Sequence, residues 1–160
     1  MMKSFPKLCL LSVFTFFLFV FAGCGEQRPE GFPKLYPVTL DFAQEGKPLD
    51  NAVVRLYSEE VAWVISGRTD SGGRVRFLTH GKYPGVPAGT YKISVVKDHI
   101  EPRPGYVLKD EFDTMATDAY ALVAPEYESA ATTPLTLTVD GKKTESFELG
   151  KAVRIKRIGE

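Results

Sequence analysis

Apolar and polar residues alternate in short runs along most of this 160-residue chain. Seven such runs follow Tyr36: residues 38–42, 52–57, 63–65, 75–77, 91–95, 135–139 and 147–149. Alternation with a period of two is typical of β-strands that bury one face. The runs therefore predict an all-β domain, and a seven-stranded Greek-key β-sandwich is the simplest architecture for it.

Turn-forming residues separate the runs. The tetrapeptides DSGG at 70–73 and DGKK at 140–143 contain residues that tolerate a positive φ, so each is predicted to close a hairpin. From residue 98 to residue 133 the alternation lapses, and a short helical turn is expected near 111–119. Long loops are often functional, which makes this segment and the loop at 79–90 the expected places for a binding surface.

The N-terminus has a different pattern, because Lys3 and Lys7 precede an apolar run from residue 8 to residue 22. A basic start, an apolar stretch and small residues at its end are the parts of an export signal. The run would make about 22 Å of helix, which is shorter than the roughly 30 Å hydrocarbon core of a bilayer. A removed signal is therefore favoured over a permanent membrane span.

The sequence FAGC at 21–24 resembles the lipoprotein box of bacterial lipoproteins, in which the cysteine is lipidated and becomes the first residue of the mature chain. This resemblance implies a signal peptide over 1–23 and a lipid on Cys24. A polar tether over 24–35 and a β-sandwich domain over 36–160 complete the predicted organisation. An ordinary secretory signal followed by a free cysteine is the alternative.

The lipid would attach the domain to a membrane, since several acyl chains together anchor a protein durably. Gly25 and not an aspartate follows Cys24, and the resemblance to lipoprotein sorting then implies the outer membrane. We expect the domain to face the periplasm or the cell surface. Cys9 lies inside the predicted signal and Cys24 carries the lipid, so no disulfide is expected in the exported domain.

Composition narrows the class of partner. The chain has 20 basic and 20 acidic side chains and a formal net charge of zero. A chain with equal numbers of positive and negative side chains has no overall positive charge to attract a polyanion, so no nucleic-acid partner is expected. Its 44% of hydrophobic residues is sufficient for a buried core and excludes disorder of the whole chain.

Four segments carry a resemblance to a known family: PVTLDFAQEGKPLDNAVVRLYS, GRTDSGGRVRFLTH, GVPAGTYKISVVK and YESAATTPLTLTVDGKKTESFEL. Together they resemble the carboxypeptidase-regulatory-like, transthyretin-like domains of bacterial surface lipoproteins, over residues 37–149. The resemblance implies a prealbumin-like sandwich and a non-catalytic accessory or adhesive module.

The chain contains no convincing catalytic pattern. The DSGG tetrapeptide occurs in the nucleophile region of trypsin-like proteases, but Thr69 stands where that family has glycine. Ser94 and Lys97 are an odd number of residues apart, so a strand would send their side chains to opposite faces. His80 and His99 lack close ligand spacing, so we expect no enzyme activity, no cofactor and no metal.

Aromatic residues offer the candidate binding site. Tyr83 and Tyr106 each lie beside proline or glycine, and exposed aromatic rings stack on sugars or anchor partner proteins. Trp63 and Tyr91 are expected in the core instead. The basic tail at 151–157 either contacts anionic lipid or polysaccharide or continues a strand.

These observations predict a lipid-anchored β-sandwich module with a non-catalytic binding or structural role. Its expected partners are the membrane, through the lipid anchor, and an envelope protein or glycan. A carbohydrate-recognition module of the cell envelope is the alternative, and a metal-dependent hydrolase is a further one.

Overall fold

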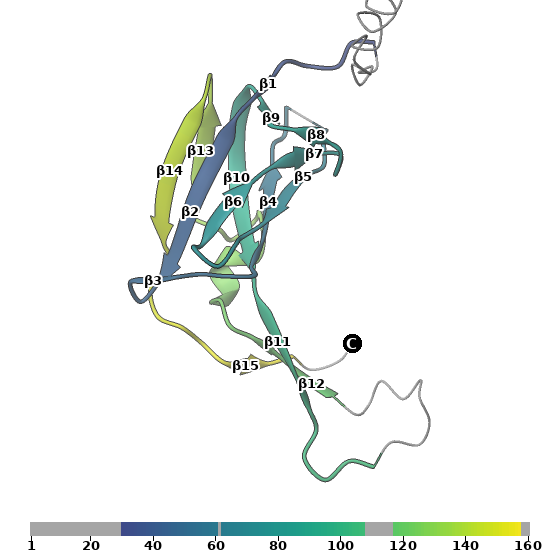
Figure 1. The fold of residues 1–160 in the computed structure, drawn as a ribbon, viewed down its shortest axis with the longest axis vertical. Coiled ribbons are helices and arrows are strands. Elements are labelled where there is room, and N and C mark those ends of the chain that lie inside the picture. Colours follow the sequence, from purple (N-terminus) through teal and green to yellow (C-terminus); the bar gives the residue numbers. More distant parts are fainter. Residues whose placement is uncertain (1–29, 61, 108–116, 158–160) are drawn as a thin grey trace, which may run out of the picture. The chain divides into compact units, whose positions relative to one another are not determined.

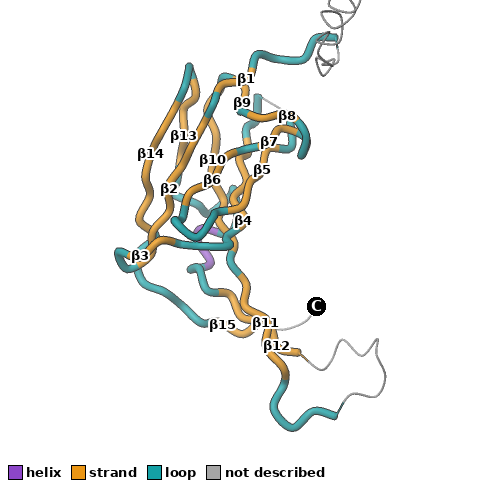
Figure 2. Tube along the Cα trace, viewed as in Figure 1, coloured by secondary structure: helices purple, strands orange, loops and turns teal. Residues whose placement is uncertain are grey.

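Strands dominate the computed structural model, which describes residues 30–60, 62–107 and 117–157 (Figure 1). Within these ranges the only helical segment is a single 3-10 turn, η3 (Pro125–Tyr127) (Figure 2). The all-β class predicted from the sequence is therefore confirmed. The chain divides into two compact units, Met1–Phe32 and Pro33–Glu160, and all the described strands belong to the second.

The largest sheet has six strands in the order β13-β10-β4-β5-β7-β8, and every neighbouring pair is antiparallel. Its strands are β4 (Val53–Tyr57), β5 (Ile65–Arg68), β7 (Leu78–Thr79), β8 (Tyr83–Pro84), β10 (Gly89–Val96) and β13 (Thr136–Val139). The other described strands lie in three smaller sheets.

The second sheet is built around β2 (Val38–Gln44). Along one edge β2 pairs in parallel with β14 (Lys143–Glu148), which lies beside it in Figure 1. Its other edge pairs with two antiparallel strands, β3 (Lys47–Pro48) and β6 (Arg74–Arg76). A separate short pair joins β1 (Leu35–Tyr36) to β9 (Val86–Pro87).

Side chains from both sheets share one hydrophobic cluster. Fully burying a large aliphatic or aromatic side chain contributes about 1.5–3 kcal/mol, so this cluster is the main source of stability. Each of the seven predicted runs overlaps a strand of these sheets, and Leu40 on β2 and Ile93 on β10 are both 0% exposed, as the alternation predicts. Tyr91 is buried as expected, and Trp63 is partly buried against the cluster.

The predicted hairpin at 70–73 is wrong in its pairing, although the turn forms. The Asp70 carboxylate accepts hydrogen bonds from the backbone N–H groups of Gly72 at 2.9 Å and Arg74 at 3.0 Å. However, β5 pairs with β4 and β7, whereas β6 pairs with β2. The turn therefore carries the chain from one sheet to the other. Gly73 has a φ of 76°, and a Cβ there would collide with the Phe42 carbonyl, which explains the glycine.

The predicted hairpin at 140–143 is wrong for the same reason. Strand β13 pairs with β10 in the six-stranded sheet, and β14 pairs with β2 in the other sheet. The alternation locates each strand and its buried face correctly. It contains no information about which strands pair with one another. Because the strands on either side of each turn pair within different sheets, both connections cross between sheets.

The expectation of a loop without strands from 98 to 133 is also wrong. Strand β11 (Asp98–Pro102) begins shortly after β10 ends and pairs with β12 (Thr117–Ala121), and β12 pairs with β15 (Ile155–Lys156). These strands form a three-stranded sheet with little buried apolar surface, so the usual alternation is missing. Of the helical turn expected near 111–119, residues 117–119 lie in β12 and the others are outside the described residues.

The predicted signal peptide at 1–23, Cys24 and the first half of the tether at 24–35 lie outside the described residues. Leu35, the last residue of the predicted tether, already pairs with Pro87 in the strand pair β1-β9. In the part of the chain that the structure describes, no helix is long and apolar enough to cross a bilayer.

Candidate functional site

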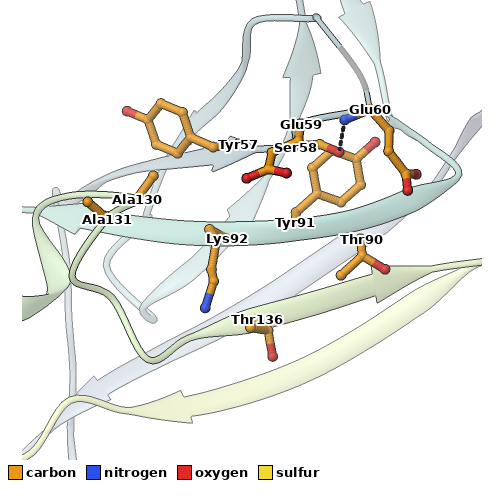
Figure 3. A pocket seen from close by; sticks show the side chains of 10 residues that line it. All are labelled: Tyr57, Ser58, Glu59, Glu60, Thr90, Tyr91, Lys92, Ala130, Ala131 and Thr136. Carbon is orange, nitrogen blue, oxygen red and sulfur yellow. Dashed lines mark hydrogen bonds between the residues drawn. The ribbon is translucent and has the colours of Figure 1, made fainter.

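A groove of about 510 Å³ lies where β4 ends and β10 begins (Figure 3). The side chains that line it come from β4, the segment after it, β10, β13 and the loop before β13: Tyr57, Ser58, Glu59, Glu60, Thr90, Tyr91, Lys92, Ala130, Ala131 and Thr136. A volume of this size is within the range of ordinary small-molecule sites.

The row of Tyr57, Lys92 and Thr136 in this groove lies on the outer face of the six-stranded sheet, meaning the face opposite the hydrophobic cluster, whereas Tyr91 belongs to the cluster. Tyr57, Lys92 and Thr136 are directly opposite one another on the three adjacent strands β4, β10 and β13. Residues directly opposite in antiparallel strands point to the same face. Their chain neighbours Leu56 and Leu137 are buried in the cluster, so the row itself points away from it. At about 4.8 Å between strands, the row spans roughly 10 Å.

Tyr57 presents an aromatic wall to this groove. The residue is 41% exposed, although its chain neighbour Leu56 is buried. In Figure 3 the side chains of Ala130 and Ala131 lie on the same side of the groove as the Tyr57 ring. Because alanine side chains are small, they leave the neighbourhood of the ring open to a ligand.

The charged side chains of the groove are not paired with one another. Lys92, Glu59 and Glu60 are exposed, and none makes an ion pair with another residue of the described ranges. The Ser58 hydroxyl accepts a hydrogen bond from the backbone N–H of Glu60 at 3.3 Å, which orders the turn that carries both carboxylates (Figure 3). One ammonium and two carboxylates are thus available to a ligand.

Tyr91 and Thr90 contribute from the start of β10. The Tyr91 hydroxyl donates a hydrogen bond to the Pro87 carbonyl at 2.9 Å, and burial raises the pKa of Tyr91 to about 12. Tyr91 is therefore neutral near pH 7, and its hydroxyl is engaged by the Pro87 carbonyl. The hydroxyls of Thr90 and Thr138 lie 3.4 Å apart on neighbouring strands.

Tyr83 and Tyr106, the binding residues predicted from the sequence, do not line this groove. Tyr83 belongs to β8 and is only 8% exposed, with the Lys82 ammonium 5.1 Å from its ring centre. Tyr106 follows β11 and is half-buried, and the Arg103 guanidinium lies 5.7 Å from its ring centre. The structure does not bring the two rings together on one sheet, and their binding role stays a prediction.

The groove residues themselves were missed by sequence reasoning. Tyr57 and Lys92 occupy the outward positions of alternating runs, where most polar or aromatic residues have no function. The signal that singles them out is the cross-strand register, in which Lys92 lies between Tyr57 and Thr136. That register depends on pairing between distant segments and is not encoded in any local motif.

A second polar region is the three-stranded sheet, whose charges are mutually paired. The Asp118 carboxylate accepts hydrogen bonds from Lys156 Nζ at 2.8 Å and from the Arg103 guanidinium at 3.0 Å. Both contacts hold the pKa of Asp118 below its ordinary value, and the hydrogen bond from Lys156 contributes most to this lowering. Glu101 accepts a hydrogen bond from Arg154 at 2.6 Å, and this contact lowers the pKa of Glu101.

The basic tail at 151–157 contributes to the same sheet. Its residues Ile155–Lys156 form β15, so the interpretation of this tail as a strand is confirmed there. The Arg157 guanidinium donates hydrogen bonds to Asp98 and Glu128, each at 2.7 Å, and these two carboxylates raise the pKa of Arg157. Arg154, Lys156 and Arg157 of the tail are therefore directed at carboxylates of this chain.

Other candidate chemistry is dispersed over the domain. His80 packs edge-on against Trp63, with ring centres 4.7 Å apart, whereas His99 lies 3.7 Å from the Glu101 carboxylate. Among the residues with described positions, no group of three or more histidine, cysteine, aspartate and glutamate side chains is close enough to hold a metal ion.

Ser94 and Lys97 do not form a nucleophile and base pair. Lys97 Nζ donates a hydrogen bond to Asp50 at 2.7 Å and lowers the pKa of that carboxyl. Ser94 is 0% exposed. The η3 segment packs against β10, so part of the outer face of this sheet is covered.

No protein-family model matches this chain, and no curated protein sequence matches it either. The fold and the groove define an all-β protein with a ligand-sized groove on its largest sheet. The resemblance to transthyretin-like domains of surface lipoproteins stays a prediction.

Proposed function

We propose that this chain is a lipid-anchored β-sandwich module of the bacterial cell envelope with a non-catalytic binding role. The N-terminal pattern supports the anchor: Lys3 and Lys7 precede an apolar run that ends in FAGC at 21–24. The lipid would be carried by Cys24, and the outer membrane, facing the periplasm or the cell surface, is the proposed location.

The shared core supports the sandwich architecture. The two larger sheets bury their inner faces in one hydrophobic cluster. Seven of their strands in the described ranges have three or more residues: β2, β4, β5, β6, β10, β13 and β14. Connections that cross between sheets, as at 70–73 and 140–143, are characteristic of Greek-key sandwiches.

The observation that carries the binding role is the groove on the outer face of the six-stranded sheet. An exposed aromatic ring, that of Tyr57, lies in the same groove as hydroxyl side chains and Lys92, which has no ion-pair partner among the residues with described positions. Binding sites combine an apolar surface with a few placed polar groups in this way. The site also stands on paired strands, which hold its side chains more rigidly than a loop would.

Metabolic labelling with a fatty acid in a bacterial host tests the anchor. The parent chain is expected to incorporate label and to sediment with membranes, whereas Cys24→Ala loses both properties. Cys9→Ala is the matched control, because it removes the only other cysteine and is expected to be labelled like the parent. Equal labelling of the parent and Cys24→Ala, or no labelling of the parent, would overturn the proposed anchor.

A further inference from the structure

We infer that the groove of Tyr57, Lys92 and Thr136 binds a neutral oligosaccharide, an inference that rests on the proposed binding role and names its ligand class. The three side chains form one row across β4, β10 and β13 on an outer sheet face. Each supplies a different type of contact, and together these contacts match the chemistry of a sugar.

The Tyr57 ring supplies the platform. One face of a pyranose ring consists largely of C–H groups, and such a face packs against an aromatic ring while its hydroxyls stay hydrogen-bonded at the rim. Tyr57 is 41% exposed, and the nearby lining residues Ala130 and Ala131 are small. A flat ring-shaped ligand therefore has both a surface to stack on and room to approach it.

The polar groups of the groove supply both kinds of hydrogen bond. Lys92 is only a donor, Glu59 and Glu60 are only acceptors, and threonine hydroxyls such as that of Thr136 are both. A sugar hydroxyl is also both donor and acceptor, so neighbouring hydroxyls of one sugar satisfy an ammonium and a carboxylate together. Peptides and lipids present far fewer such groups for the same surface area.

The charges of the groove favour a neutral sugar over an acidic one. Two carboxylates against one ammonium leave a local excess of negative charge, which opposes uronic acids, phosphates and nucleic acid. A neutral polyol meets no such repulsion and hydrogen-bonds with all three charged side chains.

The dimensions favour an oligosaccharide over a single sugar. The row spans roughly 10 Å across three strands, and the groove of about 510 Å³ continues from it to Thr90 and Glu60 (Figure 3). A chain of sugars covers this length, whereas a single ring contacts only one end of it.

The test uses the full chain, solubilised in a detergent without a sugar headgroup, because such a headgroup would compete for the groove. Binding is measured against cellohexaose, maltohexaose, xylohexaose and mannohexaose as neutral probes. A galacturonic acid hexamer is the acidic probe. We expect at least one neutral probe to bind and the acidic probe to bind more weakly.

Three variants locate the site. Tyr57→Ala is expected to weaken binding about tenfold, which corresponds to the loss of about 1.4 kcal/mol. Tyr57→Phe keeps the ring and is expected to bind like the parent, which separates loss of stacking from any loss of folding. Tyr120→Ala removes a half-buried tyrosine of β12, outside the groove, and is expected to leave binding unchanged.

Three results would overturn this inference: no neutral probe binds, the acidic probe binds as tightly as the neutral ones, or Tyr57→Ala binds like the parent. A loss of binding in Tyr120→Ala but not in Tyr57→Ala would place the sugar on the three-stranded sheet and overturn it as well. Fatty-acid labelling of the same preparations separates the two proposals. A protein that is lipidated at Cys24 yet binds none of the neutral probes contradicts only the ligand class.

Discussion

The two polar regions of this domain differ in how their charges are used. On the three-stranded sheet, Asp118 accepts hydrogen bonds from both Lys156 and Arg103. Around the groove, Lys92 and Glu59 have no ion-pair partner in the described ranges. Charges that satisfy one another hold the chain together, whereas unpaired charges that line a cavity remain available to a ligand.

The regions also differ in what stabilises them. The six-stranded sheet contributes Ile93, which is 0% exposed, to a hydrophobic cluster. The three-stranded sheet instead exposes Ile100 by 66% and Ile155 by 44%. Burial of apolar side chains therefore stabilises the six-stranded sheet, whereas ion pairs and strand pairing stabilise the three-stranded sheet.

The largest expected effect on the free energy of unfolding comes from shortening a core side chain in the sheet that carries the groove. Ile93→Ala removes a fully buried side chain and is expected to lower the free energy of unfolding by about 2–5 kcal/mol. Ile100→Ala on the following strand is the matched control, and its exposed side chain predicts a change of no more than about 0.5 kcal/mol. Denaturant unfolding of both variants measures this difference, and equal losses would contradict the division between the regions.

A smaller and local effect is expected from Asp118→Asn. The substitution removes the charge that pairs with Lys156 and Arg103, so the three-stranded sheet should open more often while the hydrophobic cluster is unchanged. Limited digestion with trypsin reports this opening, because the enzyme cleaves after lysine and arginine. We expect faster cleavage after Lys156 than in the parent.

Asp41→Asn is the control for that experiment. Asp41 pairs only with Arg74 among the described residues, on the second sheet, at 2.9 Å. Its loss is expected to leave cleavage after Lys156 at the rate of the parent. An unchanged rate in Asp118→Asn would mean that the ion pairs do not hold this sheet.

The smallest effect is expected from Lys92→Ala. Because its ammonium has no partner in the described part of the chain, its removal should change the free energy of unfolding by no more than about 0.5 kcal/mol. Thermal or denaturant unfolding measures this value. A clear destabilisation would show that Lys92 has a structural role like that of Lys156, and the contrast between the two regions would fail.

The strands and their buried faces could be predicted from the sequence. The alternation around Leu40 and Ile93 is produced by burial of one strand face, which is a local property, and both residues are fully buried. The DSGG turn was also predictable, because its aspartate hydrogen-bonds backbone groups two and four residues later. Nothing local reveals that the strands on either side of it join different sheets.

The groove could not be predicted, because it depends on the pairing of segments far apart in the chain. Lys92 lies opposite Tyr57 and Thr136 only because β10 is between β4 and β13. For Tyr83 the local sequence was misleading. Its proline and glycine neighbours indicated an exposed loop, yet β8 pairs with β7 and the residue is buried. The three-stranded sheet was missed because ion pairs there replace the apolar side chains that make strands recognisable.

Amide hydrogen exchange at about pH 7 and about pH 2 tests the contrast between the two regions most directly. Lys156 and Arg103 hold the pKa of Asp118 below its ordinary value, and Arg154 does the same for Glu101. A carboxylate whose pKa is lower in the folded state than in the unfolded state stabilises the fold. This stabilisation is complete above the ordinary pKa of about 4 and is lost as the pH falls through the lower pKa of the folded state. The account predicts that β12 and β15 lose protection at the acidic pH while β4 and β10 keep it. Retained protection in β12 and β15, or loss in all four strands together, would contradict it.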